Sequence, residues 1–393
     1  MKRIKKLFLL FWLIACSGCH TPSNEDPFIR GVDISSIVSL ENSGVTFFDF
    51  EGKPCNLYSF LRSQGVTHVR VRVWVDPYDE NGQGYGGGNC DLDTAIKIAK
   101  EAKKACLKMI VDFHYSDFWA DPSRQLAPKS WKDKNVQEKE KLLYDYTYQS
   151  LEKLQRTGVK IAMVQVGNET TNGLVGETDW SQISRLMQAG SQAIRQFDSN
   201  IQIAVHFTDP QREGYLAYFA RTLKQYEVDY DVFGTSYYSY WHGTLNQLST
   251  CLEEISQTYD KDVMVLETAF PYTLQDSDGF ANNAGETLSY AYEVSPEGQK
   301  DAILDVMETV HRLSRGIGFC YWEPAWISVG GNSYEENKVV WETWGSGCSN
   351  PAAHEYDPEH VGSYICGSSW DNQALFDSSG RPLSSLTAFQ YEL

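Results

Sequence analysis

Eight short apolar runs alternate with longer amphipathic segments between residues 30 and 324. The stretches between the runs, such as 91–105, 136–156 and 180–196, are long enough for crossover helices. Strands and helices that alternate in this way build parallel sheets, and eight strands favour a closed barrel over an open doubly wound sheet. We therefore predict an α/β protein with a single (β/α)8 barrel. The expected strands are RGVDISSI, HVRVRVW, LKMIVDFHY, IAMVQVGNE, IQIAVHF, DVFGTSYY, DVMVLETAF and GIGFCYWEP.

The expected barrel domain spans residues 28–393, and its longest loops fall on one face. The connections after the second, third, seventh and eighth runs are long, and the first of these is rich in glycine. Each of them follows a strand, so they should lie on the carboxyl face, where the loops of such barrels build the active site. Residues 329–393 show no strong periodicity, and no linker precedes them. We expect them to wrap the barrel mouth rather than to form a second domain.

The first 27 residues are expected to serve export rather than the fold. Residues 1–15 combine a basic start with a short apolar core, as a signal peptide does. The sequence Leu-Ile-Ala-Cys that ends at Cys16 resembles a bacterial lipobox, with Cys19 as a second candidate for the lipid-bearing residue. Residues 16–27 would then be a tether, and a plain cleaved signal peptide is the alternative. We expect an exported bacterial lipoprotein at the outer membrane or cell surface, or in the periplasm, with no other contact to the membrane than its lipid anchor.

The formal net charge of −18 narrows the choice of ligand. No basic stripe offsets this charge, so we do not expect nucleic acid as a partner. No glycine-rich phosphate-binding motif opens a helix after a strand, which argues against a nucleotide cofactor. Aromatic residues reach 13%, and flat rings stack well on the apolar faces of sugars, although surplus tyrosines can simply pack between helices. These features favour a neutral carbohydrate ligand, and we expect the protein to be a monomer.

Two of the apolar runs end on a glutamate. Glu169 closes the fourth run, and Glu267 lies near the end of the seventh. In a (β/α)8 barrel, side chains at the carboxyl ends of the strands point into the active site. Two carboxyl groups that converge there can act as the acid/base and the nucleophile of a glycosidase. We therefore predict that this pair catalyses the hydrolysis of a sugar.

The neighbours of the two glutamates suggest separate roles. Asn168 precedes Glu169, and its amide can bind the hydroxyl beside the reacting carbon while Glu169 acts as the acid/base. A strand-end glutamate paired with an arginine for structural reasons is the alternative. Glu267, as the nucleophile, must stay ionised, and Arg72 and Tyr238 are candidates to hold it in that state.

Further side chains at the strand ends should surround the pair. Arg70 and Arg72 have the same parity along the second run, so either could instead form a salt bridge inside the barrel. His114 lies near the end of the third run and could bind a sugar hydroxyl, while Trp322 in the eighth could form the floor of the subsite where the bond breaks. No second histidine lies at ligand spacing from His114, so we do not expect it to bind a metal.

Five sequence blocks resemble the signatures of one enzyme family. The blocks are similar to those of endo-β-1,4-galactanases, glycoside hydrolase family 53, and the match runs from about residue 30 to the end of the chain. This resemblance implies a retaining (β/α)8 hydrolase of clan A, with Glu169 as the acid/base and Glu267 as the nucleophile. The blocks are 114–122 (HYSDFWADP), 165–169 (QVGNE), 267–272 (ETAFPY), 321–326 (YWEPAW) and 371–377 (DNQALFD).

The same resemblance implies hydrolysis inside β-1,4-galactan, the neutral side chain of pectin and of type I arabinogalactan. From the residues alone, another clan A β-glycanase such as a mannanase or xylanase stays open, as does a non-catalytic surface glycan-binding protein. Residues 172–176 lack the aromatic ring that the family usually carries after its Asn-Glu block, so the subsites on that side stay open too. The substrate-binding residues expected from the strand ends and the family blocks are Asp33, Arg72, His114, Asp117, Trp119, Asn168, Tyr238, Trp322 and Trp326.

A loop after the seventh run suggests a calcium site. Residues 276–282 (DSDGFAN) place oxygen donors at alternate positions around a glycine, as a loop that wraps a hard cation does, and an aspartate-rich surface turn is the alternative. Some galactanases of the family bind calcium with a similar loop tied to the C-terminal segment. Phe280 replaces a histidine of those relatives, which is harmless if the backbone oxygen is the ligand. The structural calcium ligands implied by the loop and the resemblance are Asp276, Asp278, Phe280, Asn282, Ser368 through its carbonyl, and Asp371.

The cysteines say little about the fold. Cys106 and Cys320 lie within apolar runs and are expected to be buried thiols. Cys348 and Cys366 share the terminal segment, where a disulfide between them is possible but is not required by the sequence.

Overall fold

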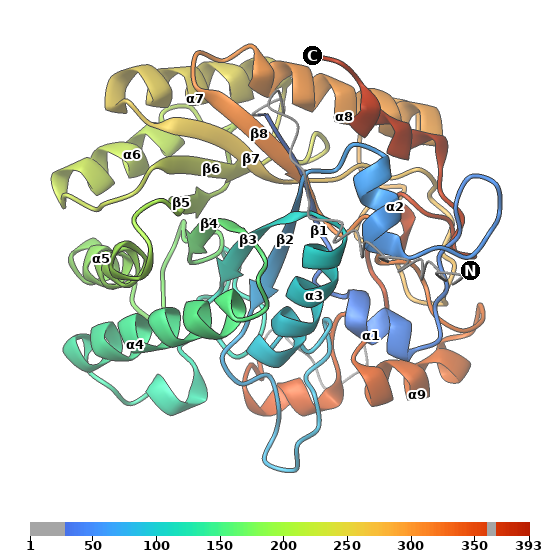
Figure 1. The fold of residues 1–393 in the computed structure, drawn as a ribbon, viewed down its shortest axis with the longest axis horizontal. Helices are drawn as coiled ribbons and strands as arrows, with labels where there is room; N and C mark the ends of the chain where they lie inside the picture. Colours follow the sequence, from blue (N-terminus) through green and yellow to red (C-terminus); the bar gives the residue numbers. More distant parts are fainter. Residues whose placement is uncertain (1–27, 360–366) are drawn as a thin grey trace, which may run out of the picture.

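The computed structural model describes residues 28–359 and 367–393, and its centre is a closed barrel of eight parallel strands. Each strand pairs with the next one in chain order, and β8 returns to pair with β1. Helices surround the barrel (Figure 1). The predicted (β/α)8 fold is therefore confirmed. The strands are β1 (Ile29–Asp33), β2 (His68–Val73), β3 (Lys108–Phe113), β4 (Ile161–Val166), β5 (Gln202–Phe207), β6 (Val232–Ser236), β7 (Asp262–Thr268) and β8 (Gly316–Tyr321).

The helices follow the amphipathic segments of the sequence. The predicted segments 91–105, 136–156 and 180–196 correspond to α3, α4 and α5 to within one residue at each end. Polar caps mark where helices begin, as at α4, where Asn135 and Glu138 form a reciprocal capping box. The helices are α1 (Ile37–Asn42), α2 (Leu57–Ser63), α3 (Leu92–Lys104), α4 (Val136–Gln155), α5 (Trp180–Phe197), α6 (Tyr215–Gln225), α7 (Leu245–Tyr259), α8 (Pro296–His311) and α9 (Tyr334–Trp344), with short 3-10 helices η1 (Lys129–Trp131), η2 (Pro351–Glu355), η3 (Asp371–Gln373) and η4 (Ser384–Gln390).

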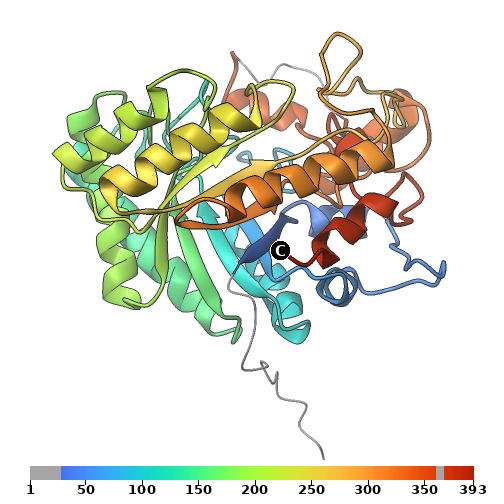
Figure 2. The same ribbon diagram turned by 90° about the horizontal axis from the view of Figure 1, so that it is seen from above.

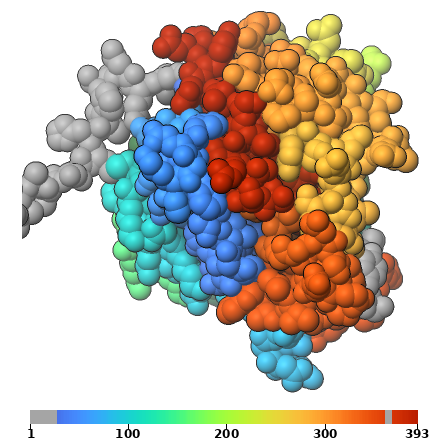
Figure 3. All heavy atoms as spheres, turned by 90° about the vertical axis from the view of Figure 1, so that its right-hand side faces the viewer, coloured from blue at the N-terminus to red at the C-terminus, as the bar shows by residue number. Residues whose placement is uncertain are grey.

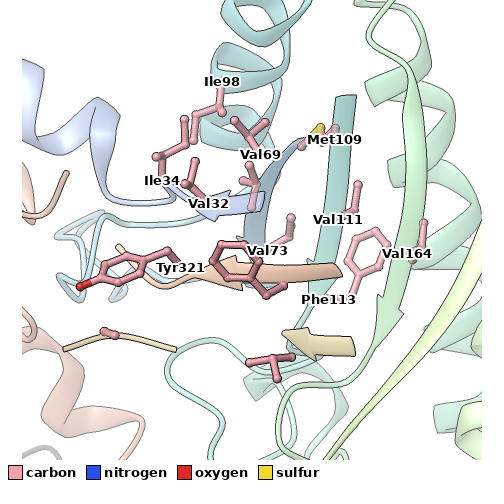
Figure 4. Packing of buried hydrophobic residues seen from close by; sticks show 14 of the residues in the cluster. Val32, Ile34, Val69, Val73, Ile98, Met109, Val111, Phe113, Val164 and Tyr321 are labelled. Atoms are coloured by element: carbon pink, nitrogen blue, oxygen red, sulfur yellow. The ribbon is translucent and has the colours of Figure 1, made fainter. Parts of the chain in front are cut away.

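Apolar side chains pack on both faces of the barrel wall. Along β2, Val69 packs toward the helices beside Ile98 of α3 (Figure 4). Arg70 and Arg72 alternate with the valines of β2 and are each only 1% exposed. The period of two along β2 therefore places its arginines inside the barrel and its valines against the helices. A separate apolar cluster is made of Ile29, Ile110, Met163, Ala204, Val232, Met264, Leu266 and Cys320.

The C-terminal segment begins at the barrel mouth. After α9, the chain pairs with the glycine-rich loop that follows β2. The backbone N–H of Gly87 donates to the carbonyl of Gly347 at 2.7 Å, and that of Gly88 donates to the carbonyl of Gly345 at 2.8 Å. This part of the chain matches the expectation that residues 329–393 wrap the mouth.

The end of the segment departs from that expectation, because it covers the flank of the barrel. The 3-10 helix η4 packs against α8 and lies between α8 and the N-terminal part of the chain (Figures 2 and 3). Phe389 of η4 stacks on Phe319 of β8, with ring centroids 5.5 Å apart. At Gly65, where φ is +101°, an added Cβ would lie 2.2 Å from the Phe389 carbonyl oxygen, so only glycine allows this close approach.

The cysteines fall into two groups. Cys320 is a buried free thiol, as predicted. The prediction for Cys106 is wrong, because this residue is exposed and disulfide-bonded; it occupies a turn with φ +57° before β3 rather than the strand itself. Cys348 is also disulfide-bonded, while Cys366, which the sequence offered as a possible partner, lies outside the described residues.

The predicted signal peptide (1–15) and tether (16–27), with Cys16 and Cys19, also lie outside the described residues. Within the part of the chain that the structure describes, no helix is long and apolar enough to cross a bilayer.

Candidate active site

The carboxyl ends of the strands surround one cleft of about 590 Å³. Glu169 and Glu267 both line it, and each carboxyl group is close enough to influence the titration of the other. Asp33, Arg72 and Asp117 were also expected to bind substrate but are not among the lining residues. The predicted substrate-binding residues that do line the cleft are His114, Trp119, Asn168, Tyr238, Trp322 and Trp326.

The backbone after β4 places Glu169 in the cleft. The chain turns at Gly167, where φ is +83° and an added Cβ would lie 2.5 Å from Cγ2 of Thr170. Glu169 itself has φ +42°, a left-handed conformation that non-glycine residues adopt rarely and most often at functional sites. The hydroxyl of Ser236, at the end of β6, donates to Oε1 of Glu169 at 2.6 Å.

Glu267 lies on β7, and its side chain is 8% exposed. The Arg70 guanidinium lies 2.9 Å from Oε1, and the Tyr238 hydroxyl donates to Oε2 at 3.1 Å. Of the two residues predicted to hold Glu267 as the anion, Tyr238 contacts it and Arg72 does not. The arginine beside this carboxylate is Arg70, the other inward-facing arginine of β2.

Unequal surroundings separate the titration of the two carboxyl groups. Burial raises the pKa of Glu169 well above its usual range, and the charge of Glu267 raises it further. Burial also raises the pKa of Glu267, but the Arg70 cation and the Tyr238 hydroxyl oppose that rise. When the pair holds one proton, that proton therefore belongs to Glu169, and Glu267 is the carboxylate.

The Arg70 guanidinium contacts five side chains at the strand ends. Its Nε donates to Gln165 at 3.1 Å. One terminal nitrogen contacts Asp33 at 3.0 Å and Glu267 at 2.9 Å, and the other contacts Asp112 at 2.8 Å and Asn168 at 2.9 Å. The guanidinium thus connects the ends of β1, β3, β4 and β7. Asp33 was expected to bind substrate, but its second oxygen accepts from Ser35, and it is fully buried.

Arg72 lies behind the cleft wall rather than in the cleft. Its guanidinium contacts Glu323 at 2.5 Å and donates to the Gly87 carbonyl at 2.7 Å. The same group lies 4.6 Å from the centroid of the Trp119 ring. Arg72 is therefore the interior salt-bridge partner that the sequence left open, and it supports an aromatic ring instead of touching the substrate.

Tryptophans form one wall of the cleft. Trp119 and Trp326 stack with centroids 6.1 Å apart, and each indole N–H is already bonded to a backbone carbonyl. Trp322 meets Trp370 edge to face at 4.6 Å. Trp241 lines the cleft as well and is 41% exposed. These rings present flat apolar faces, which suit the apolar faces of sugar rings.

His114 lines the cleft but has no ring nitrogen to offer. The indole N–H of Trp74 donates to Nδ1 at 3.1 Å, so Nε2 carries the proton and donates to Asp112 at 3.0 Å. The predicted hydrogen bond from His114 to a sugar hydroxyl is therefore wrong. His114 instead helps to fix Asp112, which also contacts Arg70.

Asp117 organises loops behind the cleft. It is fully buried, and its two carboxylate oxygens accept from the backbone N–H groups of Asp76 and Lys129 at 3.0 and 2.7 Å. Both oxygens thus hold the loops that follow β2 and β3, and Asp117, which was predicted to bind substrate, does not line the cleft. Residues 172–176, where the family ring is missing, contribute the buried side chains Leu174 and Val175 rather than a cleft wall.

Several residues of the site were missed in the sequence. Ser236 and His206 have the inward parity of their strands, which could have indicated them. Trp241 closes an aromatic cluster, YYSYW, directly after β6, which is also a usable signal. Trp370 lies in a segment without periodicity, where no sequence signal places it beside Trp322.

The predicted calcium loop lies against the C-terminal segment. Asp278 is fully buried, and its oxygens accept from the backbone N–H groups of Phe280 and Ser368 at 2.9 and 2.8 Å. Both oxygens of Asp371 and the side-chain oxygen of Asn282 are buried without a hydrogen-bond partner in the described residues. Burial raises the pKa of Asp278 to about 6 and that of Asp371 to about 8, and the charge of Asp278 adds to the rise at Asp371.

These orphaned oxygens fit a cation that prefers oxygen ligands. One carboxylate oxygen of Asp276 accepts from the backbone N–H groups of Asp278 and Gly279, as in an Asx turn. Phe280, in the same loop, also lines the cleft. Across residues 28–359 and 367–393, no group of three His, Cys, Asp or Glu side chains has the arrangement of a metal site. Any cation here would therefore depend on amide and carbonyl oxygens as well as carboxylates.

A (β/α)8 barrel in which one carboxyl group follows β4 and another lies at the end of β7, both in a cleft with a wall of tryptophans, has the site of a glycoside hydrolase. Residues 29–389 match the model of glycosyl hydrolase family 53, and the chain belongs to that family.

Similar proteins cover most of the chain. An endo-beta-1,4-galactanase of Bacillus subtilis (strain 168) is 52% identical over 94% of this chain and 86% of its own. An arabinogalactan endo-beta-1,4-galactanase of Cellvibrio japonicus (strain Ueda107) is 32% identical over 96% of this chain and 94% of its own. Among solved structures, the Ignisphaera aggregans GH53 catalytic domain superposes with a TM-score of 0.81 at 34% identity, covering 94% of this chain and 98% of that one.

The contact between Arg70 and Glu267 predicts a pH effect. In Arg70→Gln the pKa of Glu267 should rise, because a cation that lowers it is lost. The nucleophile reacts only when ionised, so the acidic limb of kcat/KM for a chromogenic β-glycoside should move to higher pH by about 1–3 units. The matched control is Arg72→Gln, which removes an equally buried cation that does not touch Glu267. Equal shifts in both variants would contradict the assignment.

Proposed function

We propose that this protein hydrolyses β-1,4-galactosidic bonds inside galactan and type I arabinogalactan, the neutral side chains of pectin, with retention of configuration. The reaction rests on one observation: of the two carboxyl groups that line one cleft, it is Glu267 that contacts an arginine. The substrate is supported by membership of family 53 and by relatives named as endo-beta-1,4-galactanases. Family membership also favours galactan over the mannan or xylan of other clan A enzymes.

In the first step, Glu267 would attack the anomeric carbon and form a galactosyl-enzyme. Arg70 and Tyr238 favour the ionised form of this carboxylate and contact both of its oxygens. Glu169 would donate its proton to the leaving glycosidic oxygen, which its raised pKa allows near neutral pH.

In the second step, the ionised Glu169 would take a proton from water, and the water oxygen would displace Glu267 from the sugar. Both steps invert the anomeric carbon, so the product retains the original configuration. One N–H of the Asn168 amide donates to the Ala120 carbonyl at 2.9 Å, and the amide oxygen accepts from Arg70. Its second N–H is therefore oriented for the hydroxyl beside the reacting carbon.

The substrate test compares polysaccharides. Wild-type protein should release galacto-oligosaccharides from potato galactan and little reducing sugar from mannan or xylan, and proton NMR should show the β-anomer of the new reducing end first. Glu267→Gln should reduce kcat by about a thousandfold or more. The control is Glu335→Gln, which removes a carboxylate that pairs with Lys338 on the surface.

Other outcomes would identify the alternatives. Faster release of sugar from mannan or xylan would assign a different clan A β-glycanase activity. Binding of galactan without turnover by wild type, unchanged in Glu267→Gln, would instead make the protein a surface glycan-binding protein.

We further propose that calcium binds between the loop after β7 and the C-terminal segment. Asp278, Asp371 and Asn282 would supply side-chain oxygens, with Asp276 and the carbonyls of Phe280 and Ser368 completing the shell. The unpaired buried oxygens of Asp371 and Asn282 support this proposal. The ion would neutralise the buried carboxylates and hold the two loops beside the cleft, which is a structural role.

Calcium removal should lower the melting temperature. A chelator should reduce Tm by about 5 °C relative to calcium at a hundredfold excess over Kd, and added calcium should restore it. Asp371→Asn should abolish this difference. In the control Asp79→Asn, which alters an Asx turn at the tip of another loop, the calcium effect should persist. A Tm that does not respond to calcium in the wild type would refute the site.

We also propose that the mature protein is a lipoprotein anchored through Cys16. The lipobox-like sequence that ends at this residue supports the proposal. In a bacterial host supplied with labelled palmitate, wild type should incorporate label and Cys16→Ala should not. Retained label in Cys16→Ala that is lost in Cys19→Ala would move the anchor to Cys19, and no label in wild type would indicate a cleaved signal peptide.

A further inference from the structure

A chain of hydrogen bonds runs behind Glu169 through two neighbouring strands. The Ser236 hydroxyl, on β6, donates to Oε1 of Glu169 at 2.6 Å, and Nε2 of His206, on β5, lies 2.9 Å from the same hydroxyl oxygen. Ser236 and His206 are fully buried and are not among the residues that line the cleft. They therefore act on the substrate only through the residues that they contact, and Ser236 does so through Glu169.

The other side of the His206 ring decides which nitrogen carries its proton. The backbone N–H of Glu169 donates to Nδ1 at 3.3 Å and has no other acceptor in the described part of the chain. The Gln165 amide nitrogen lies 3.1 Å from Nδ1, and Oδ1 of Asn168 lies 2.9 Å from it. That Oδ1 already accepts from Arg70 and Gln165, at 2.9 and 3.1 Å. Nδ1 is therefore the acceptor, and the ring proton lies on Nε2.

This tautomer fixes the direction of the next bond. Because Nε2 of His206 carries a proton, it donates to Ser236 and cannot accept from it. A hydroxyl has a single proton, and that of Ser236 must then go to Oε1 of Glu169. Oε1 is an acceptor in both charge states of Glu169, so the carboxyl proton resides on Oε2.

We propose that Ser236 and His206 are positioning residues that hold Oε1 of Glu169 as an acceptor, so that Oε2 is the oxygen that exchanges the catalytic proton. This inference rests on the proposed function, in which Glu169 is the acid/base. In the first step the proton moves from Oε2 to the leaving oxygen, and in the second step a proton of water returns to Oε2. Ser236 and His206 keep their own protons throughout.

Charges around the chain keep His206 neutral. Burial lowers the pKa of His206 well below its usual range, and the Arg70 cation lowers it further. The carboxylate of Asp112 opposes this shift, and His114 adds to it. A neutral His206 ring has only one N–H. With that N–H at Nε2, His206 donates to Ser236, and Ser236 donates to Glu169.

The Ser236 hydroxyl also acts on the titration of Glu169. Burial and the charge of Glu267 raise the pKa of Glu169, and the more distant Asp121 does the same. The Ser236 hydroxyl and Arg70 oppose that rise, because each stabilises the ionised form. Loss of the hydroxyl should therefore raise the pKa of Glu169.

The pH profile tests the role of Ser236. In Ser236→Ala, the basic limb of kcat/KM on galactan should move up by about one pH unit, because that limb reports the acid in the free enzyme. For an aryl β-galactobioside with a good leaving group, kcat should fall mainly at low pH, where water attack needs ionised Glu169. Ser236→Thr keeps a hydroxyl and should restore the wild-type limb. A basic limb that stays in place in Ser236→Ala would overturn the proposal.

The tautomer can be tested without turnover. In wild-type protein with 15N-labelled histidine, assigned by comparison with His206→Gln, the His206 signals should show a protonated Nε2 and an unprotonated Nδ1 throughout the active pH range. A protonated Nδ1 would overturn the proposal, because Ser236 could then donate to His206. Failure of wild type to cleave galactan would instead count against the proposed function, and the NMR result would still decide the direction of the hydrogen bonds.

Discussion

The site depends on the burial of one guanidinium group, that of Arg70. A cation without solvent is stable only if its donors all find acceptors and its charge is balanced. The strand ends meet that requirement, with carboxylates from Asp33, Asp112 and Glu267 around it. Because these acceptors come from separate strands, satisfying Arg70 also fixes how the strand ends lie relative to one another. The contacts that balance the charge of Arg70 are thus the same contacts that position Glu267 for catalysis.

The charge balance of the interior explains why two glutamates of one barrel behave differently. Carboxyl groups outnumber the guanidinium groups of Arg70 and Arg72, so the interior cannot hold all of them ionised at low cost. Glu267 takes the contact with Arg70, and Arg72 is occupied by Glu323. Within the described residues, the carboxyl group of Glu169 accepts only from the neutral hydroxyl of Ser236, so the shared proton of the pair resides on Glu169.

The sequence predicted the barrel well because burial and periodicity are local signals. It placed Glu169 and Glu267 at one cleft by counting strands alone. It named Arg72 rather than Arg70 as the partner of Glu267, since both arginines face inward and only the register of β2 against its neighbours sets which one meets Glu267. It also assigned His114 to the substrate, because a sequence shows that a side chain has polar atoms but not whether the protein already uses them.

The packing of η4 against β8 has a consequence for how the molecule assembles. β1 and β8 pair with each other, and the residues that cover their flank are among the last in the chain. β1 therefore keeps an unpaired edge until β8, the last strand of the barrel, is available to pair with it. Closure of the barrel thus requires a contact between two strands that are far apart in the sequence, and η4, which follows later in the chain, then packs against β8.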